Sequence, residues 1–181
     1  MEQKTWTLDA AHSAVNFSVR HLVVAKVRGR FASFSANVNF DENDLTRSSV
    51  TVDIDASSID TGVADRDKHL RSADFFDVER FPKLHFESTK VEQAGAGYRV
   101  HGNLTIRDVT RPALLELEYG GRAKDPWGNE KAAFAATTSL NRNDFGLKWN
   151  QALEAGGVLV GERVDIELEV ELVKAAATRA A

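Results

Sequence analysis

The chain has 181 residues, of which 43% are hydrophobic and 28% charged, and its formal net charge is -4. This composition is typical of one soluble globular domain, and the lack of a basic excess argues against a protein that tracks nucleic-acid phosphates. The chain contains no cysteine, which excludes a disulfide framework and any thiolate metal site or nucleophile.

The first residues lack the basic, apolar and small-residue regions of a secretory signal, and no apolar run approaches the roughly 20 residues of a membrane span. We therefore expect a cytoplasmic protein without stable membrane insertion. A trimmed mature chain with a new initiator Met would look the same and would be periplasmic. We expect one domain over residues 1–174 and a disordered tail over residues 175–181.

Apolar and polar residues alternate along most of the chain, which is the pattern of half-buried antiparallel strands. A short strand is expected at residues 6–8, and three long strands follow near residues 15–19, 34–40 and 50–54. The inward-facing residues of these long strands are Val15, Phe17 and Val19, then Phe34, Ala36, Val38 and Phe40, then Val50, Val52 and Ile54.

A long connection then runs from Ser57 to Pro82. Its residues 64–72 have a helical composition with acidic residues in the first turn, which predicts a short helical capping segment near residues 64–77. A second long connection, from Asn141 to Arg163, carries large apolar residues and the paired Gly156 and Gly157. Both connections are expected to cover barrel ends.

Four further strands precede the second connection and one follows it, and turn-forming residues separate most of them. Their inward residues are Leu84 and Phe86, then Tyr98, Val100, Gly102, Leu104 and Ile106, then Ala113, Leu115, Leu117 and Tyr119, then Ala132, Phe134 and Ala136, and finally the even-numbered residues of 164–172. Successive hairpins of this kind predict an all-β fold, an extended eight-stranded antiparallel up-and-down barrel.

A barrel of eight strands is just wide enough to be filled by side chains or to hold one small ligand. Small inward residues, Gly102 and the alanines at 132–136, favour an unfilled apolar pore that a long hydrocarbon would occupy. The alternative is a filled barrel, in which Phe17, Phe34, Phe40, Phe86 and Phe134 meet in the middle.

Strand parity then predicts the residues that line the pore. They are Phe17, Val19, Phe34, Val38, Val52, Ile54, Phe86, Leu104, Ile106, Leu115, Leu117, Phe134, Ala136, Phe145, Trp149, Ile166 and Leu168. The basic residues of the capping segment are expected near the polar head of an amphiphile, together with two aromatic residues of the same segment. This predicted mouth consists of Arg66, His69, Arg71, Phe75 and Phe76. The alternative for the basic residues is a solvated helix face.

The sequence offers little support for catalysis or for a bound cofactor. Asp65, Asp67 and His69 stand two residues apart, which spreads them around a helix, and the five histidines form no pair at metal-binding spacing. No nucleophile elbow, phosphate loop or dinucleotide motif follows a strand. We predict no metal, no cofactor and no catalytic residue.

Two alternative functions stay open. An enzyme acting on an isoprenoid or acyl lipid would use His69 as general base with Asp67 or Asp74. A stress-related interaction protein would have a filled barrel.

Four ordered stretches, which together extend from about Trp6 to Leu172, resemble the YceI-like family, whose members are described as polyisoprenoid-binding and lipocalin-like. The stretches are 9–22 with 27–31, 58–61 with 66–77 and 81–82, 102–112, and 141–150. The resemblance implies an eight-stranded lipocalin-like barrel with an elongated apolar pore, and often a homodimer. The ligand it implies is a long-chain amphiphile such as an isoprenoid quinone or a prenyl phosphate, which is bound, stored or transported.

Overall fold

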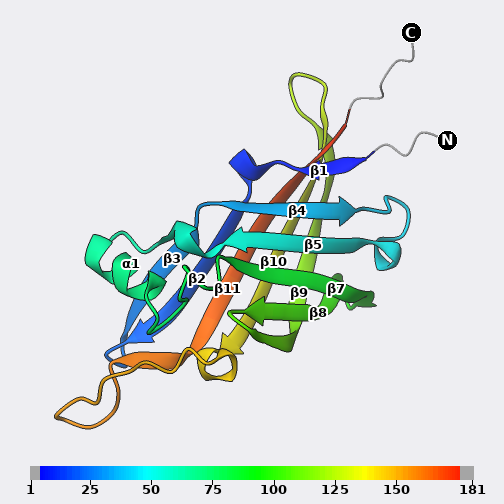
Figure 1. The fold of residues 1–181 in the computed structure, drawn as a ribbon. Helices are drawn as coiled ribbons and strands as arrows, with labels where there is room; N and C mark the ends of the chain where they lie inside the picture. Colours follow the sequence, from blue (N-terminus) through cyan, green and yellow to red (C-terminus); the bar gives the residue numbers. More distant parts are fainter. Residues whose placement is uncertain (1–4, 176–181) are drawn as a thin grey trace.

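A single curled antiparallel sheet makes up most of the molecule (Figure 1). The computed structural model describes residues 5–175. Within them the strands are β1 (Trp6–Leu8), β2 (Ala14–His21), β3 (Ala25–Phe31), β4 (Phe34–Asn39), β5 (Ser49–Asp55), β6 (Ile59–Asp60), β7 (Lys83–Ala94), β8 (Gly97–Ile106), β9 (Val109–Lys124), β10 (Glu130–Asn141) and β11 (Val160–Lys174). The residues expected in a disordered tail lie, from 176 onward, outside the described part.

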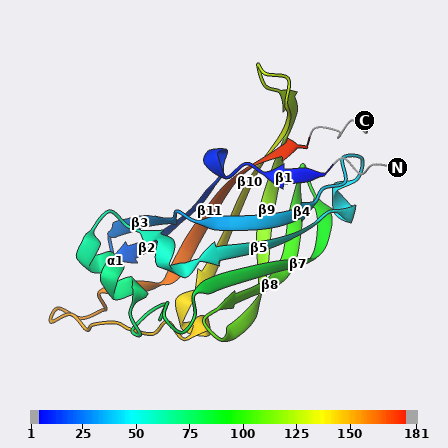
Figure 2. The same cartoon turned by 45° about the horizontal axis from the view of Figure 1, so that its top comes forward.

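The strands follow the order β4-β5-β7-β8-β9-β10-β11-β2-β3-β6, and β1 pairs with β11 beside this path. The wall from β4 to β11 therefore follows the order of the chain, with hairpins between most neighbouring strands and long connections after β5 and β10. In the described part of the chain β4 pairs only with β5, so the sheet curls into a half-barrel whose edge at β4 has no further strand partner, although β1 lies beside it. Figure 2 shows how the wall bends around its interior.

The all-β, lipocalin-like fold class is confirmed, but the number of strands was wrong. The eight predicted long strands are present, and β3 and β6 were missed. Strand β3 continues the hairpin from β2, with Phe17 opposite Gly29 and Val15 opposite Phe31. Its inward residues are Val27, Gly29 and Phe31, and the missing side chain at Gly29 interrupts the apolar pattern.

The predicted capping segment contains the helix α1 (Ala64–Arg71) and the turns that follow it. Short 3-10 helices lie at η1 (Ala10–His12), η2 (Leu45–Arg47), η3 (Ala56–Ser58) and η4 (Arg142–Phe145). In Figures 1 and 2, α1 and the β2–β3 turn lie at one end of the sheet, and the β9–β10 turn projects from the other.

The two ends of the barrel are built differently. At the end that we call the packed end, the rings of Trp6, Phe40, Tyr119 and Phe134 contact one another, with centroids 5.0 to 6.0 Å apart. Glu42 is tied to this end, since it accepts a hydrogen bond from Trp6 Nε1 at 3.0 Å and pairs with Lys174 Nζ at 2.5 Å. The opposite end, which carries α1, the β2–β3 turn and the loop 146–159, is called the mouth end below.

Candidate functional site

A cavity of about 540 Å³ lies inside the curled sheet and under α1. Its volume falls within the range of small-molecule sites, roughly 300–1,000 Å³. The wall is made mainly of valine, leucine, isoleucine and phenylalanine side chains, which come from β2 to β5 and from β7 to β11. Arg20 and Asp65 line the cavity and are also exposed, so the cavity reaches the surface between β2 and α1.

Most of the predicted pore residues line this cavity. They are Phe17, Val19, Phe34, Val38, Val52, Ile54, Phe86, Leu104, Ile106, Leu115, Trp149, Ile166 and Leu168. Many of them, such as Phe34 and Ile166, face inward and yet are only partly buried. An inward side chain keeps accessible surface when it borders unfilled space, because packed interiors leave few voids larger than a water molecule. Whether these side chains contact a ligand stays a prediction.

Four residues predicted to line the pore lie outside it. Leu117 and Phe134 pack against the buried cluster of the packed end, and Ala136 is buried beside Val100 and Leu115. Phe145 is 3% exposed and packs in the cluster under α1. Strand parity identifies the inward face but not the level along the barrel axis, which is why these four were misplaced.

The small residues that we expected to leave the cavity open, the alanines at 132–136 and Gly102, do not line it, whereas Ala14, Ala36 and Ala113 do. Ala132 is fully buried against the packed end, and Ala133 and Ala135 face outward and are exposed. Gly102 makes room for a ring: a Cβ there would lie 2.4 Å from Phe86 Cζ. Gly29 does the same for Phe17, at 2.4 Å from Phe17 Cζ. These glycines let rings lie flat against the wall, so the rings do not close the middle.

His69 lies at the mouth among aromatic rings. Its ring centroid is 4.6 Å from Trp149 and 5.1 Å from Phe75, and its Nε2 is 2.8 Å from Asp74 Oδ2. The α1 helix and the loop after η4 thus meet across this histidine. Trp149 and the α1 segment together form the roof of the cavity, where Phe75 and Phe76 also line it.

The other basic residues of the capping segment differ in role. Arg66 lines the cavity, and it donates hydrogen bonds to Thr61 Oγ1 at 2.7 Å and to the Thr61 carbonyl at 2.8 Å. Arg71 does not line the cavity. It donates to the carbonyls of Ser57 and Ile59, and so holds the segment around β6. Arg71 thus lies at the mouth end, but its position on α1 turns it toward that segment rather than toward the cavity.

Asp67 is buried and accepts hydrogen bonds from the backbone N–H and hydroxyl of Thr61, at 2.9 and 2.5 Å. Asp74, rather than Asp67, is therefore the partner of His69. Of the two carboxylates considered as partners of a general base, only that of Asp74 contacts His69.

Arg142 is a cavity residue that sequence reasoning missed. The side chain is 4% exposed and donates to the carbonyls of Leu147 at 2.6 Å, Gly161 at 2.8 Å and Trp149 at 2.9 Å. Burial lowers the pKa of its guanidinium below the usual value. The Gly146 turn right after η4 was a signal of a tightly folded loop, but nothing in the sequence indicates that the loop wraps around an arginine.

The wall has a gap in its backbone pairing between β9 and β10. Their ladder ends at Thr137 opposite Glu116, although both strands continue. Beyond this point Thr138 Oγ1 donates to the Leu114 carbonyl at 2.7 Å. An outer groove of about 1060 Å³ lies over the gap, and it shares with the cavity the lining residues Leu104, Ala113, Thr138, Leu140 and Ile166.

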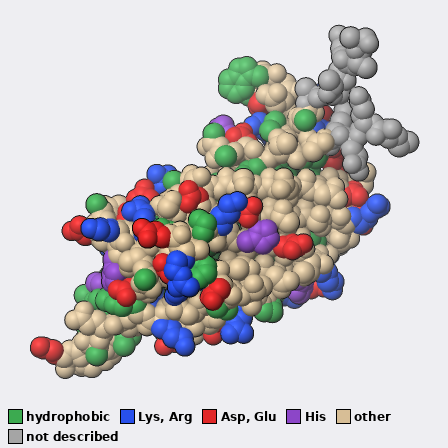
Figure 3. Space-filling model, in the orientation of Figure 1, with side chains coloured by type: hydrophobic (Ala, Val, Ile, Leu, Met, Phe, Trp, Pro, Cys, Tyr) green, Lys and Arg blue, Asp and Glu red, His purple; other side chains and the backbone are tan. Residues whose placement is uncertain are grey.

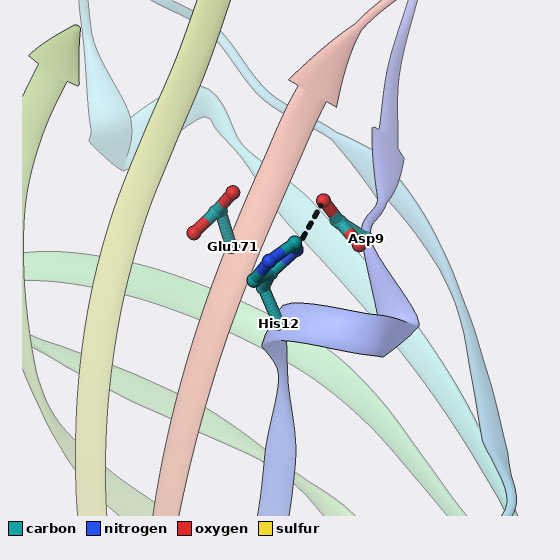
Figure 4. A group of neighbouring side chains, drawn as sticks. All are labelled: Asp9, His12 and Glu171. Carbon is teal, nitrogen blue, oxygen red and sulfur yellow. Dashed lines mark hydrogen bonds and ion pairs between the residues drawn. The ribbon is translucent and has the colours of Figure 1, made fainter. Parts of the chain in front are cut away.

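A separate group of ionisable residues lies outside the cavity, near the packed end. Asp9, His12 and Glu171 bring their ligand atoms within 4.8 Å of one another (Figure 4). However, Lys131 Nζ is 2.6 Å from Asp9 Oδ2 and 2.9 Å from Glu171 Oε1. The Lys131 ammonium thus lies between the two carboxylates. The hydrogen bonds of Lys131 and His12 to Asp9 lower the pKa of Asp9 to about 2.

Among residues 5–175 no helix is long and apolar enough to cross a membrane. Curated relatives align with nearly the whole chain. A UPF0312 protein of Vibrio parahaemolyticus is 41% identical over 167 residues, which cover 91% of this chain and 83% of the relative. A UPF0312 protein of Staphylococcus aureus is 38% identical, over 92% of this chain and 95% of the relative.

Solved structures share the fold. BcnA of Burkholderia cenocepacia superposes with a TM-score of 0.79 at 23% identity, over 91% of this chain and 98% of that one. The YceI protein of Campylobacter jejuni gives 0.71 at 29% identity, over 96% and 100%. A polyisoprenoid-binding domain from Saccharophagus degradans, implicated in plant cell wall breakdown, gives 0.66 at 14% identity over the same shares. The YceI-like domain family matches residues 6–172, and the chain therefore belongs to that family.

Proposed function

We propose that this protein is a non-catalytic carrier or store of a long-chain amphiphile of the polyisoprenoid type, an isoprenoid quinone or a prenyl phosphate. Membership of the YceI-like family and the shape of the fold favour a lipid-binding barrel. The observation that carries the proposal is the apolar cavity, because its wall offers area for a hydrocarbon tail and few hydrogen-bonding groups.

The length of the cavity also supports an extended ligand. Along β11 the lining residues run from Val160 to Val170, which at the rise of a β-strand corresponds to roughly 30 Å of wall. A compact ligand would leave much of such a wall uncovered. A linear tail would contact it throughout, and each buried CH₂ contributes about 0.8 kcal/mol before the cost of ordering the chain.

The polar members of the lining support a position for the head group at the mouth. Arg20, His21, Arg66 and His69 lie there with Thr61 and Asp65. The Nε and one terminal nitrogen of Arg66 donate hydrogen bonds to Thr61. The other terminal nitrogen can therefore donate to a ligand oxygen. Such a mouth suits a phosphate or a quinone oxygen better than a cationic head.

The direct test is mass spectrometry of organic extracts of the natively purified protein, combined with titration of the extracted protein with isoprenoid probes. We expect a co-purifying lipid or saturable binding of one probe per chain. The proposal would be contradicted if the extracts contained no lipid and the extracted protein showed no saturable binding of any probe.

A matched pair of substitutions locates the binding. Ala36 lines the cavity, whereas Ala135 is exposed on the outer face. Ala36→Phe adds a ring inside the cavity and is expected to weaken probe binding by about tenfold or more while leaving the fold intact. Ala135→Phe adds the same ring outside and should leave binding unchanged. Equal probe binding by both variants would show that the ligand does not bind in this cavity.

A catalytic alternative rests on one observation, the pair of His69 and Asp74 beside the cavity. A histidine held by a carboxylate can act as a general base. Turnover of a bound lipid that disappears in His69→Ala, with lipid binding retained, would support this alternative against the carrier. Lipid recovered chemically unchanged after incubation with the protein supports the carrier.

A further inference from the structure

Large apolar side chains are exposed mainly around the mouth. In the described part of the chain they are Leu22, Val23, Val24, Val63 and Val158, with Leu114 and Trp127 elsewhere. Val63 lies between Thr61 and Asp65, and Val158 precedes Leu159, and these three neighbours line the cavity. The backbone N–H of Leu22 donates to the carbonyl of Leu159 at 3.0 Å, so the β2–β3 turn and the loop 146–159 adjoin.

Figure 3 shows hydrophobic side chains gathered on the end of the molecule at the lower left, where Figure 1 places these elements. We call Leu22, Val23 and Val24 the apolar tip. Val24 is 82% exposed and Val23 68%. Exposed apolar residues scattered singly are normal on proteins, but three in succession on a projecting turn beside a cavity mouth are the pattern of an interaction site.

The backbone of the apolar tip does not suit the residues that occupy it. Leu22 and Val23 have φ values of 51° and 68°, which is the left-handed region that glycine and asparagine adopt easily. A β-branched residue is strained there. Folding of the hairpin alone would favour polar or glycine residues at both positions. These residues therefore cost stability in two ways: the backbone is strained, and apolar side chains are exposed to water.

The hairpin that carries the tip is basic. From Ala14 to Phe31 the sequence contains Arg20, Lys26, Arg28 and Arg30 but no aspartate or glutamate, in a chain whose net charge is -4. Lys26 and Arg28 are exposed, and within residues 5–175 neither forms an ion pair. An apolar tip flanked by basic residues is complementary to the interface of a bilayer that contains anionic lipid.

We propose that the apolar tip docks on an anionic lipid bilayer, so that the cavity mouth faces the membrane. The purpose of docking rests on the proposed carrier function, since a polyisoprenoid tail must leave a bilayer to enter the cavity. Docking itself requires no ligand. A second copy of the chain fits the tip less well, because a stable dimer buries about 800 Å² on each partner and a three-residue turn offers far less.

The test uses the full chain and vesicles of phosphatidylcholine with or without phosphatidylglycerol, measured by flotation. The key variant is Leu22→Asn, Val23→Gly and Val24→Ser together. Asparagine and glycine suit the left-handed backbone, so the variant should be at least as stable to heat as the original chain. Its affinity for the mixed vesicles should nevertheless fall by about tenfold or more.

Controls separate location and charge. Trp127→Ser removes an apolar side chain that is 84% exposed in the β9–β10 turn, at the other end of the molecule, and should leave flotation unchanged. Lys26→Gln with Arg28→Gln should weaken binding to the mixed vesicles, and added salt should do the same. Flotation that survives the triple variant, or that is lost in Trp127→Ser, would overturn the proposal.

The outcomes also separate docking from carriage. The triple variant should still bind an isoprenoid probe supplied in detergent, because the tip does not line the cavity. Ala36→Phe should float with vesicles but bind the probe weakly. Light scattering gives the mass of both proteins: a dimer that the triple variant abolishes, with no flotation of either protein, would assign the tip to a second copy and refute membrane docking.

Discussion

The packed end and the mouth end of the barrel are built from the same strands, yet only one of them is filled. Strand β4 places Phe34 and Ala36 on the cavity wall, and immediately after it Phe40 enters the ring cluster of the packed end. Phe40 lies 5.2 Å from Trp6 and 5.4 Å from Phe134 between ring centroids. Toward the mouth, Phe31 packs against Phe17 and Phe76, with ring centroids 5.6 and 5.8 Å apart, but the inward rings of Phe34 and Phe86 border the cavity.

This difference shows that alternation decides which side chains point inward but not whether they meet. At the packed end, rings from β1, β9 and β10 converge on Phe40. In the cavity, the rings of Phe17 and Phe86 lie against glycines and stay at the wall. The same residue type therefore stabilises the fold in one region and leaves a binding space in the other.

The largest expected effect is the loss of a ring from the packed end. Phe40→Ala would leave a void among Trp6, Tyr119 and Phe134 and should lower the free energy of unfolding by about 4 kcal/mol. Phe34→Ala removes the same ring from a wall that already borders a cavity and should cost less than half as much. Urea unfolding of both variants measures the difference, and equal costs would refute the contrast between the two ends.

A second prediction concerns the loop at the mouth end. Arg142→Met leaves several buried carbonyls without their donor and should cost about 3 kcal/mol. Amide exchange should become faster in residues 146–160, while the packed end keeps its protection. The matched variant Arg163→Met removes an exposed arginine paired with Asp165, and should cost less than about 1 kcal/mol. Uniform loss of protection would show that the loop is not a separate unit.

The smallest expected effect is acid weakening of the packed end. Hydrogen bonds with Lys131 and His12 lower the pKa of Asp9 to about 2 from its ordinary 3.8, and the bond with Lys174 lowers the pKa of Glu42. Since these pKa values are lower in the folded state, the stability they add is complete above their ordinary values and is lost as pH falls toward the folded values.

Amide exchange in β1 and in the last residues of β11, followed between pH 4 and pH 2, should show this loss. Asp9→Asn removes one of the titrating groups and should make the fall with pH shallower. An unchanged pH profile in this variant would mean that the pairing with Lys131 adds nothing measurable.

Sequence reasoning predicted the fold class because the alternation is regular and long, as in residues 164–172, which lie in β11. The inward faces of β2, β4 and β5 were predicted for the same reason. Strand β3 was missed because Gly29 removes one apolar position from a seven-residue strand. The reason for glycine at position 29 becomes clear only in the structure, where the ring of Phe17 lies against it.

The site was harder to predict than the fold. Strand parity does not predict that Phe134 lies at the packed end and Phe86 in the cavity. The position of a side chain along the barrel axis depends on strand tilt and on the register shift at Ala133 and Phe134. The roles of Arg66 and Arg71 depend on which carbonyls α1 meets in space. Arg142 could not be found, since its partners come from a loop with no regular pattern.

The gap in pairing between β9 and β10 has a mechanical consequence. Between residues 109–115 of β9 and residues 138–141 of β10, the wall is joined by side chains and by the Thr138 hydroxyl rather than by a backbone ladder. Rotamer changes there can alter the bore of the barrel without breaking a backbone hydrogen bond between strands. The gap is therefore the part of the wall where the barrel can change width at the lowest cost in backbone hydrogen bonds.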